Sequence, residues 1–148
     1  MTVNPDLVGR SFPALPPYLV GREKVREFAR AVFSEDPLSL DVEAARAAGY
    51  TDLVAPPTFA VILQQQGLEQ LLAEPDAGID FGRLVHGDQR FTYTRPIVAG
   101  DELIATLAVT SVKTLAGNAI VTAVVDVIDA EGAGVVTATS TMVIRAGE

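Results

Sequence analysis

The residues best suited to acid–base chemistry lie in the segment Val-His-Gly-Asp-Gln-Arg-Phe, residues 85–91, which contains the single histidine of the chain, His86. Asp88 follows two residues later, and in an extended strand residues two apart face the same side. His86 and Asp88 could therefore form an acid–base couple, or bind the polar part of a ligand together with Gln89. A structural role also fits: Asp88 and Gln89 would then cap a loop, and His86 would lie at a contact between two subunits.

The composition excludes several other kinds of site. The chain has no cysteine, so it can form neither a disulfide nor a thiolate metal site, and one histidine cannot build a histidine-rich metal cluster. We therefore expect no metal and no cofactor. A net charge of −8 disfavours nucleic acid and anionic membranes as partners. The first residues lack an apolar signal core behind a basic start, so we expect a cytoplasmic protein.

The most apolar stretch, residues 55–74, predicts a helix over residues 57–73. Pro57 suits the first turn of a helix, and the residues that follow it are apolar on most sides of the rod. Such a helix must be covered, so we expect it at the centre of the fold, with the glutamines 64–66 on an exposed or interfacial side. The length and the 49% hydrophobic content predict one domain, residues 1–148.

Shorter elements are expected before this helix. Residues 18–20 predict a short strand, and residues 22–33 carry the apolar stripe of an amphipathic helix. Pro37 predicts a turn over residues 34–40. Asp41 is a suitable N-cap for a short helix that ends before Gly49.

The second half of the chain has the alternation typical of strands. A strand is expected from Leu84 to about Pro96, followed by three long strands over residues 102–112, 119–128 and 135–145. Small and β-branched residues on both sides of the last two strands predict a sheet covered on both faces. A helix followed by a long antiparallel meander is the order of the hot-dog fold, an α+β fold in which a curled sheet wraps one central helix. An exposed sheet edge would drive such units to pair, so we expect at least a dimer.

Several stretches of the sequence resemble the MaoC-like dehydratase/hydratase family. Within that family they are most similar to the N-terminal-type half found in subunits of actinobacterial (3R)-hydroxyacyl-thioester dehydratases. The resemblance implies a hot-dog domain that handles acyl thioesters of coenzyme A or acyl carrier protein. It rests on residues 20–29, 36–41, 53–59 and 86–101 and on the terminal strands.

The resemblance also implies which loop would carry the chemistry. Catalytic members have Asp-x-Asn-Pro-x-His before the hot-dog helix, and its Asp and His divide the acid and base roles of dehydration. Here Ser34 and Ser39 stand at those two positions, and serine without a partner is neither a useful acid nor a useful base. A His-Gly pair near the helix start, which could polarise the thioester carbonyl, is replaced by Pro56-Pro57, and proline has no N–H. This loop is therefore expected to have lost catalysis.

Two functions from different classes follow. In the first, the chain binds the acyl group while a partner hot dog with an intact loop supplies catalysis. In the second, it is a self-contained homodimer, either a thioester-binding module or a hydratase that uses His86 and Asp88. The residues expected to contact substrate are Pro57, Thr58, Phe59, Ile62 and Gln89, although Phe59 and Ile62 would fit equally well in the core.

Overall fold

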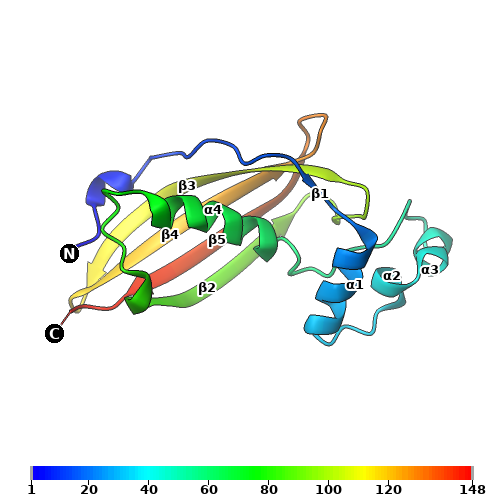
Figure 1. The fold of residues 1–148 in the computed structure, drawn as a ribbon, viewed down its shortest axis with the longest axis horizontal. Coiled ribbons are helices and arrows are strands. Elements are labelled where there is room, and N and C mark those ends of the chain that lie inside the picture. The colour runs from blue at the N-terminus through cyan, green and yellow to red at the C-terminus, as the bar shows by residue number, and fades with distance from the viewer. Residues whose placement is uncertain (1, 148) are drawn as a thin grey trace.

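The computed structural model describes residues 2–147, which form one antiparallel five-stranded sheet curled around a helix (Figure 1). The strand order is β1-β3-β4-β5-β2. The strands are β1 (Tyr18–Leu19), β2 (Leu84–Tyr93), β3 (Glu102–Leu115), β4 (Asn118–Ile128) and β5 (Gly134–Ile144). The predicted hot-dog arrangement is therefore confirmed.

The helices fall into two groups. The central helix α4 (Val61–Ala73) lies along the concave face of the sheet, whereas α1 (Arg22–Ala31), α2 (Pro37–Leu40) and α3 (Val42–Ala47) gather beyond one end of it (Figure 1). Two short 3₁₀ turns, η1 (Pro5–Leu7) and η2 (Phe81–Arg83), lie near the opposite end. None of the helices within residues 2–147 has the length and apolar character needed to cross a membrane.

Helix α4 packs closely on the sheet because of one glycine. A Cβ atom added to Gly67 would lie 3.2 Å from Cβ of Leu107 and 3.4 Å from Cγ2 of Val125. Leu63 and Leu71, one turn to either side, are fully buried on the same face of the helix. The inward-facing residues of β3, β4 and β5 complete this core, so the helix holds a fixed position over the middle strands.

The outer face of the sheet differs from the prediction. Alternate residues of β4 and β5 are buried against the helix, but those between them remain partly exposed. Many of the outward residues are threonines, such as Thr122, Thr137 and Thr139, which favour strands and tolerate water. The small and β-branched residues of these strands therefore reflect strand propensity and not a second covering layer.

The two edges of the sheet differ in whether another segment of the chain pairs with them. The N-terminal arm runs along β3, where the N–H groups of Gly9, Phe12 and Leu15 donate to carbonyls of that strand at 2.9 Å, and β1 continues the pairing. On the other side, β2 pairs with β5 alone among the described residues. One edge is thus closed by the chain itself, and the β2 edge is open.

Two local predictions need correction. The segment predicted as a turn over residues 34–40 contains α2, because the carboxylate of Asp36 accepts a hydrogen bond from the Leu38 N–H and caps a helical turn. The regular part of the central helix begins at Val61 and not at Pro57. Residues 57–60 form tight turns with bonds between residues three apart, such as Phe59 N–H to the Pro56 carbonyl.

Candidate functional site

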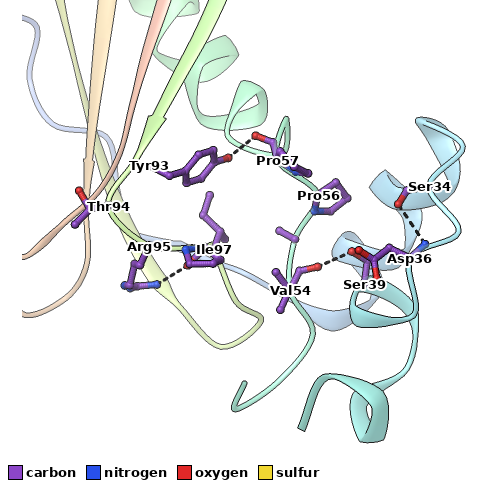
Figure 2. Close-up of a pocket in the computed structure, with 12 residues that line it drawn as sticks. Ser34, Asp36, Ser39, Val54, Pro56, Pro57, Tyr93, Thr94, Arg95 and Ile97 are labelled. Carbon is purple, nitrogen blue, oxygen red and sulfur yellow. Dashed lines mark hydrogen bonds between the residues drawn. The ribbon is translucent and has the colours of Figure 1, made fainter. Parts of the chain in front are cut away.

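The main cavity lies between the group α1–α3 and the end of β2 (Figure 2), and has a volume of about 350 Å³. It is the place where the loop of residues 34–39, the segment before α4 and the segment after β2 meet. The structure thus brings together the loop and the proline pair that the sequence singled out. The lining residues are Ser34, Asp36, Ser39, Val54, Ala55, Pro56, Pro57 and residues 93–97.

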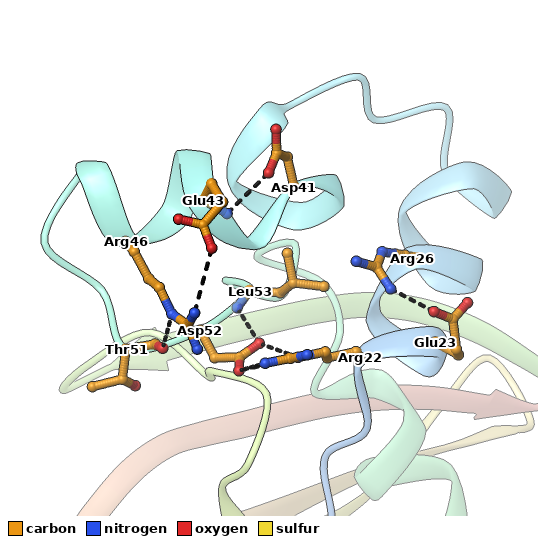
Figure 3. Close-up of polar contacts among 9 residues, drawn as sticks. All are labelled: Arg22, Glu23, Arg26, Asp41, Glu43, Arg46, Thr51, Asp52 and Leu53. Atoms are coloured by element: carbon orange, nitrogen blue, oxygen red, sulfur yellow. Dashed lines mark hydrogen bonds and ion pairs between the residues drawn. The ribbon is translucent and has the colours of Figure 1, made fainter.

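Ion pairs and caps hold the helical wall of this cavity in place (Figure 3). Arg22 of α1 binds the carboxylate of Asp52 with its nearest N–O distance at 2.8 Å, and this hydrogen bond lowers the pKa of Asp52. Arg26 donates to the carbonyl of Leu40 at 3.0 Å, and Asp41 caps α3 as the sequence predicted. These contacts tie α1 to the segment after α3 and to the junction between α2 and α3.

Ser34 and Ser39, which the family resemblance aligns with the acid and base positions, make structural hydrogen bonds. Ser39 is 4% exposed, and its Oγ donates to the Val54 carbonyl at 2.6 Å. Ser34 Oγ accepts from the Asp36 N–H at a long 3.5 Å. The Asp36 carboxylate is itself engaged as the cap of α2. The hydroxyl of Ser39 thus fastens the loop to the neighbouring segment, and neither serine has a base beside it that would activate it.

Tyr93 is the only tyrosine among the cavity residues, and it also holds structure. Its hydroxyl donates to the Pro57 carbonyl at 2.5 Å (Figure 2), and burial raises the pKa of Tyr93 to about 12. The phenol is therefore neutral near pH 7 and anchors the turns that precede α4. Pro56 and Pro57 have no N–H to offer a substrate carbonyl, and the Phe59 N–H is used within the turn.

Arg95 is the cation of the cavity wall, and two carboxylates neutralise it. It donates to Asp101 at 2.8 and 3.2 Å and to Asp129 at 3.4 Å. The hydrogen bond to Asp101 is the main reason that the pKa of Arg95 is raised further. This network ties the segment after β2 to the β4–β5 turn, and it leaves the cavity without a free positive charge from Arg95.

The predicted His86–Asp88 couple does not form. A β-bulge at Gly87 shifts the register, so that His86 lies opposite Met142 and Asp88 lies opposite Thr141. Met142 is buried on the concave side, whereas Thr141 faces outward, so the two side chains lie on opposite faces of the sheet. Asp88 instead binds Arg90 at 3.0 Å. The prediction that the side chains of His86 and Asp88 face the same side of the strand was therefore wrong.

His86 instead belongs to a chain of side chains that leads to the central helix. Its Nε2 lies 3.1 Å from Oε1 of Gln89, and Nε2 of Gln89 donates to Oε1 of Gln64 on α4. Gln64 is 4% exposed in the isolated chain, so it does not lie on an exposed side of the helix as one of the two predicted positions had it. The burial of Gln64 could not be predicted, because a run of three glutamines resembles a solvated face.

The remaining predicted contact residues are dispersed. Pro57 lines the cavity, Thr58 is exposed beside it, and Gln89 belongs to the chain just described. Phe59 is fully buried, with its ring 5.4 Å from the ring of Phe28 in an edge-to-face contact, and Ile62 packs against the same core. Phe59 is thus a core residue, as the alternative interpretation had it.

Metal ligation finds no support in the described residues. Within residues 2–147, no three His, Asp or Glu side chains gather in a way that could hold a metal ion. The polar side chains of the cavity are the carboxylate of Asp36, the hydroxyls of Ser34, Ser39 and Thr94, the neutral phenol of Tyr93 and the ion-paired guanidinium of Arg95. This set can shape a binding pocket but supplies no positioned acid and base for dehydration.

The chain matches a known protein family and its members over most of its length. Residues 6–138 match the FAS1-like, dehydratase domain region. The UPF0336 protein of Leifsonia xyli subsp. xyli is 64% identical over 146 residues, covering 99% of this chain and 98% of its own.

Two solved structures extend the comparison. One is a chain of the C-terminally truncated HadBC (3R-hydroxyacyl-ACP dehydratase) complex from Mycobacterium tuberculosis. It is 37% identical with a TM-score of 0.85, covering 93% of this chain and 97% of that one. The other, a MaoC-like dehydratase, is 35% identical with a TM-score of 0.87, covering 95% of this chain and 42% of that one. This chain therefore belongs to the family of the FAS1-like dehydratase domain region, and its hot-dog fold is that of the MaoC-like dehydratases.

Proposed function

We propose that this chain is the acyl-binding, non-catalytic subunit of a (3R)-hydroxyacyl-thioester dehydratase or enoyl-thioester hydratase. A second hot-dog chain would carry the intact Asp-x-Asn-Pro-x-His loop and supply the acid and base. The observation that carries this proposal is the cavity itself. The cavity is present beside the loop of residues 34–39. Ser34 and Ser39 occupy the acid–base positions implied by the family, and both make structural hydrogen bonds.

The shape and chemistry of the cavity support an acyl ligand. Val54, Ala55, Pro56 and Pro57 form an apolar wall, and Ile97 lies at its base. Burying a hydrocarbon chain there is favourable by roughly 0.8 kcal/mol for each methylene removed from water. The thioester would be carried by coenzyme A or acyl carrier protein, and we place the protein in the cytoplasm.

The relatives support a hot-dog partner. The M. tuberculosis structure that matches most of this chain is a complex, HadBC, described as a 3R-hydroxyacyl-ACP dehydratase. In this chain, the open β2 edge offers a surface for such a partner, whereas the β3 edge is already covered. A self-contained hydratase using His86 and Asp88 is disfavoured, because these side chains face opposite sides of the sheet.

The experiment is reconstitution with a matched pair of variants. The chain is co-expressed with the hot-dog chain of the same genome that carries the intact loop, and hydration of crotonyl and longer enoyl thioesters is followed. Pro57→Phe should narrow the cavity, raising KM for long chains several-fold while kcat stays unchanged. Thr58→Phe, an exposed neighbour outside the cavity lining, is the control and should leave both constants as in the wild type.

The proposal would be contradicted by either of two results. A wild-type chain that changes neither the rate nor the chain-length preference of the catalytic partner has no role in substrate binding. Equal effects of Pro57→Phe and Thr58→Phe on KM would show that the cavity is not the acyl site.

A further inference from the structure

Helix α1 ends in a backbone conformation that suits glycine, yet the chain has a phenylalanine there. The Ser34 N–H donates to the Ala29 carbonyl at 2.8 Å. The Phe33 N–H donates to the Arg30 carbonyl at 3.1 Å, which completes a Schellman motif. Phe33 has a φ of 58°, in the left-handed region that is unfavourable for a residue with a Cβ. Its ring is 91% exposed, so packing within residues 2–147 does not offset this strain. Strain that the fold does not need indicates a function for the side chain.

Phe33 stands beside the cavity. The next residue along the chain, Ser34, lines the cavity (Figure 2), and the preceding residue, Val32, is 44% exposed. We call Val32 and Phe33 the apolar rim. Neither is among the residues that line the cavity, so the rim projects into solvent next to it. Small ligands are held mainly by concave sites, whereas a projecting aromatic side chain is a typical anchor of a protein–protein contact.

The helix that carries the rim is basic, although the chain is acidic. Of the 11 lysines and arginines of the chain, four lie in α1, and only two of its 19 acidic residues do. Three of these four cations are held in ion pairs. Arg30, in the last turn before the rim, forms no ion pair within residues 2–147. The rim therefore has an available positive charge on one side, and the exposed carboxylate of Glu35 follows it on the other.

We propose that the apolar rim and Arg30 dock an acidic carrier protein, which delivers its acyl thioester to the adjacent cavity on a phosphopantetheine arm. This inference rests on the proposed function, which places the acyl group in that cavity. The arm is joined to its carrier by a phosphodiester, so a negative charge lies where the carrier meets the enzyme, and Arg30 is attracted to it. Phe33 packs on the surface of the carrier. Coenzyme A has no such protein surface, so the rim favours acyl carrier protein as the carrier.

The test compares one crotonyl group on two carriers, acyl carrier protein and coenzyme A, in the complex with the catalytic hot-dog chain. Phe33→Gly should raise KM for crotonyl-acyl carrier protein about tenfold, as the loss of an anchor residue does. Its kcat, and its KM for crotonyl-coenzyme A, should stay as in the wild type. The variant should fold, because glycine suits this backbone position. Leu115→Ala is the matched control, since Leu115 is 65% exposed at the far end of β3, and it should change neither constant.

Charge variants test the sign of the partner. Arg30→Ala should raise KM for crotonyl-acyl carrier protein about three- to fivefold at low salt, and added salt should reduce this difference. Glu35→Gln should lower the same KM by about twofold, because it removes a charge of the same sign as the carrier's. Lys113→Ala removes an exposed cation of β3 and controls for net charge, so it should leave KM unchanged.

Two sets of results would overturn the docking surface while leaving the proposed function standing. The first is an equal rise in KM for both thioesters in Phe33→Gly, no rise for the carrier-bound one, or a wild-type complex that hydrates only crotonyl-coenzyme A. The second is weaker assembly of Phe33→Gly with the catalytic chain in sedimentation, which would assign the rim to that chain. A wild-type chain that changes neither KM nor chain-length preference of the catalytic chain would overturn the docking surface and the proposed function together.

Discussion

The cavity and the polar contacts between α4 and β2 differ in how their polar groups are satisfied. At the cavity end, Ser39 donates to Val54, Tyr93 donates to Pro57, and Arg95 is neutralised by two aspartates. Beside β2, the buried amide of Gln64 accepts from Gln89, but its own Nε2 has no hydrogen-bond acceptor within residues 2–147. The named polar groups of the cavity are thus paired, whereas the amide of Gln64 is only partly so.

The family resemblance implies both a binding cavity and catalysis, and the structure lets us consider binding and catalysis separately. In the cavity, the hydroxyls of Ser39 and Tyr93 donate to backbone carbonyls, so neither is free to move a proton. The proposed function therefore assigns the catalytic step to a second hot-dog chain.

The largest effect is expected at Phe59, which holds the cavity end together. Phe59→Ala should lower the free energy of unfolding by about 3–5 kcal/mol, since it removes a fully buried ring that packs on Phe28 and Tyr18. Chemical denaturation measures this loss. A loss below about 1 kcal/mol, with a specific defect in acyl binding, would return Phe59 to the set of substrate contacts.

Tyr93→Phe should cost about 0.5–1.5 kcal/mol by removing the hydrogen bond to Pro57. It should also change the pH dependence. Burial raises the pKa of Tyr93 to about 12, so the folded chain keeps a phenol proton that the unfolded chain releases near pH 10. This stabilisation is complete below about pH 10 and is lost as the pH rises toward 12. Unfolding measured from pH 8 to 11 should show this decline in the wild type and a smaller one in the variant.

The result for Tyr93→Phe is interpretable only against a matched tyrosine. Tyr50→Phe provides that control, because Tyr50 lies in the loop after α3 and outside the cavity lining. If both variants flatten the alkaline decline equally, the burial of Tyr93 is not its source.

Phe33→Gly should stabilise the chain by roughly 0.5–1 kcal/mol. Phe33 ends α1 with a φ of 58° and is 91% exposed, so its ring contributes no packing while its backbone adopts a conformation that glycine prefers. Thermal unfolding of Phe33→Gly and of Phe33→Ala, which keeps the Cβ, separates the backbone effect from the loss of the ring. Destabilisation by both would show that the ring makes contacts of its own.

His86→Ala is expected to have the smallest effect on chemistry. In a reconstituted complex, kcat should stay within about threefold of the wild type, because His86 contacts the neutral amide of Gln89 and Asp88 faces the other side of the sheet. An acid or base in that position would instead lower kcat by roughly two to four orders of magnitude. Steady-state kinetics at saturating partner, with the melting temperature measured in parallel, distinguishes the two.

The fold was predictable because its elements have strong periodic signals. The apolar run of residues 55–74 and the three long alternating strands require a covered helix and a curled sheet, and both are present. The start of α4 was less predictable, since Pro57 fits a helix and also the tight turns that the structure contains. The loop of residues 34–39, which lines the cavity, was singled out by the family resemblance and not by periodicity.

The side-chain geometry of β2 could not be predicted from spacing. A glycine within a strand is a weak sign of a bulge, and the bulge at Gly87 reverses the facing of every residue on one side of it. The burial of Gln64 was equally hidden, because glutamine is mostly exposed in proteins and its neighbours Gln65 and Gln66 are polar as well. Both features depend on contacts between distant segments, α4 and β2.

The most direct measurement is enoyl-thioester hydration by the purified chain, alone and with the catalytic hot-dog chain. Because this cavity lacks a positioned acid and base, the chain alone should be slower than the complex by about 10⁴-fold or more. Addition of the partner should restore activity, with a chain-length preference that Pro57→Phe alters. Turnover by the chain alone at a rate comparable to that of the complex would contradict the account.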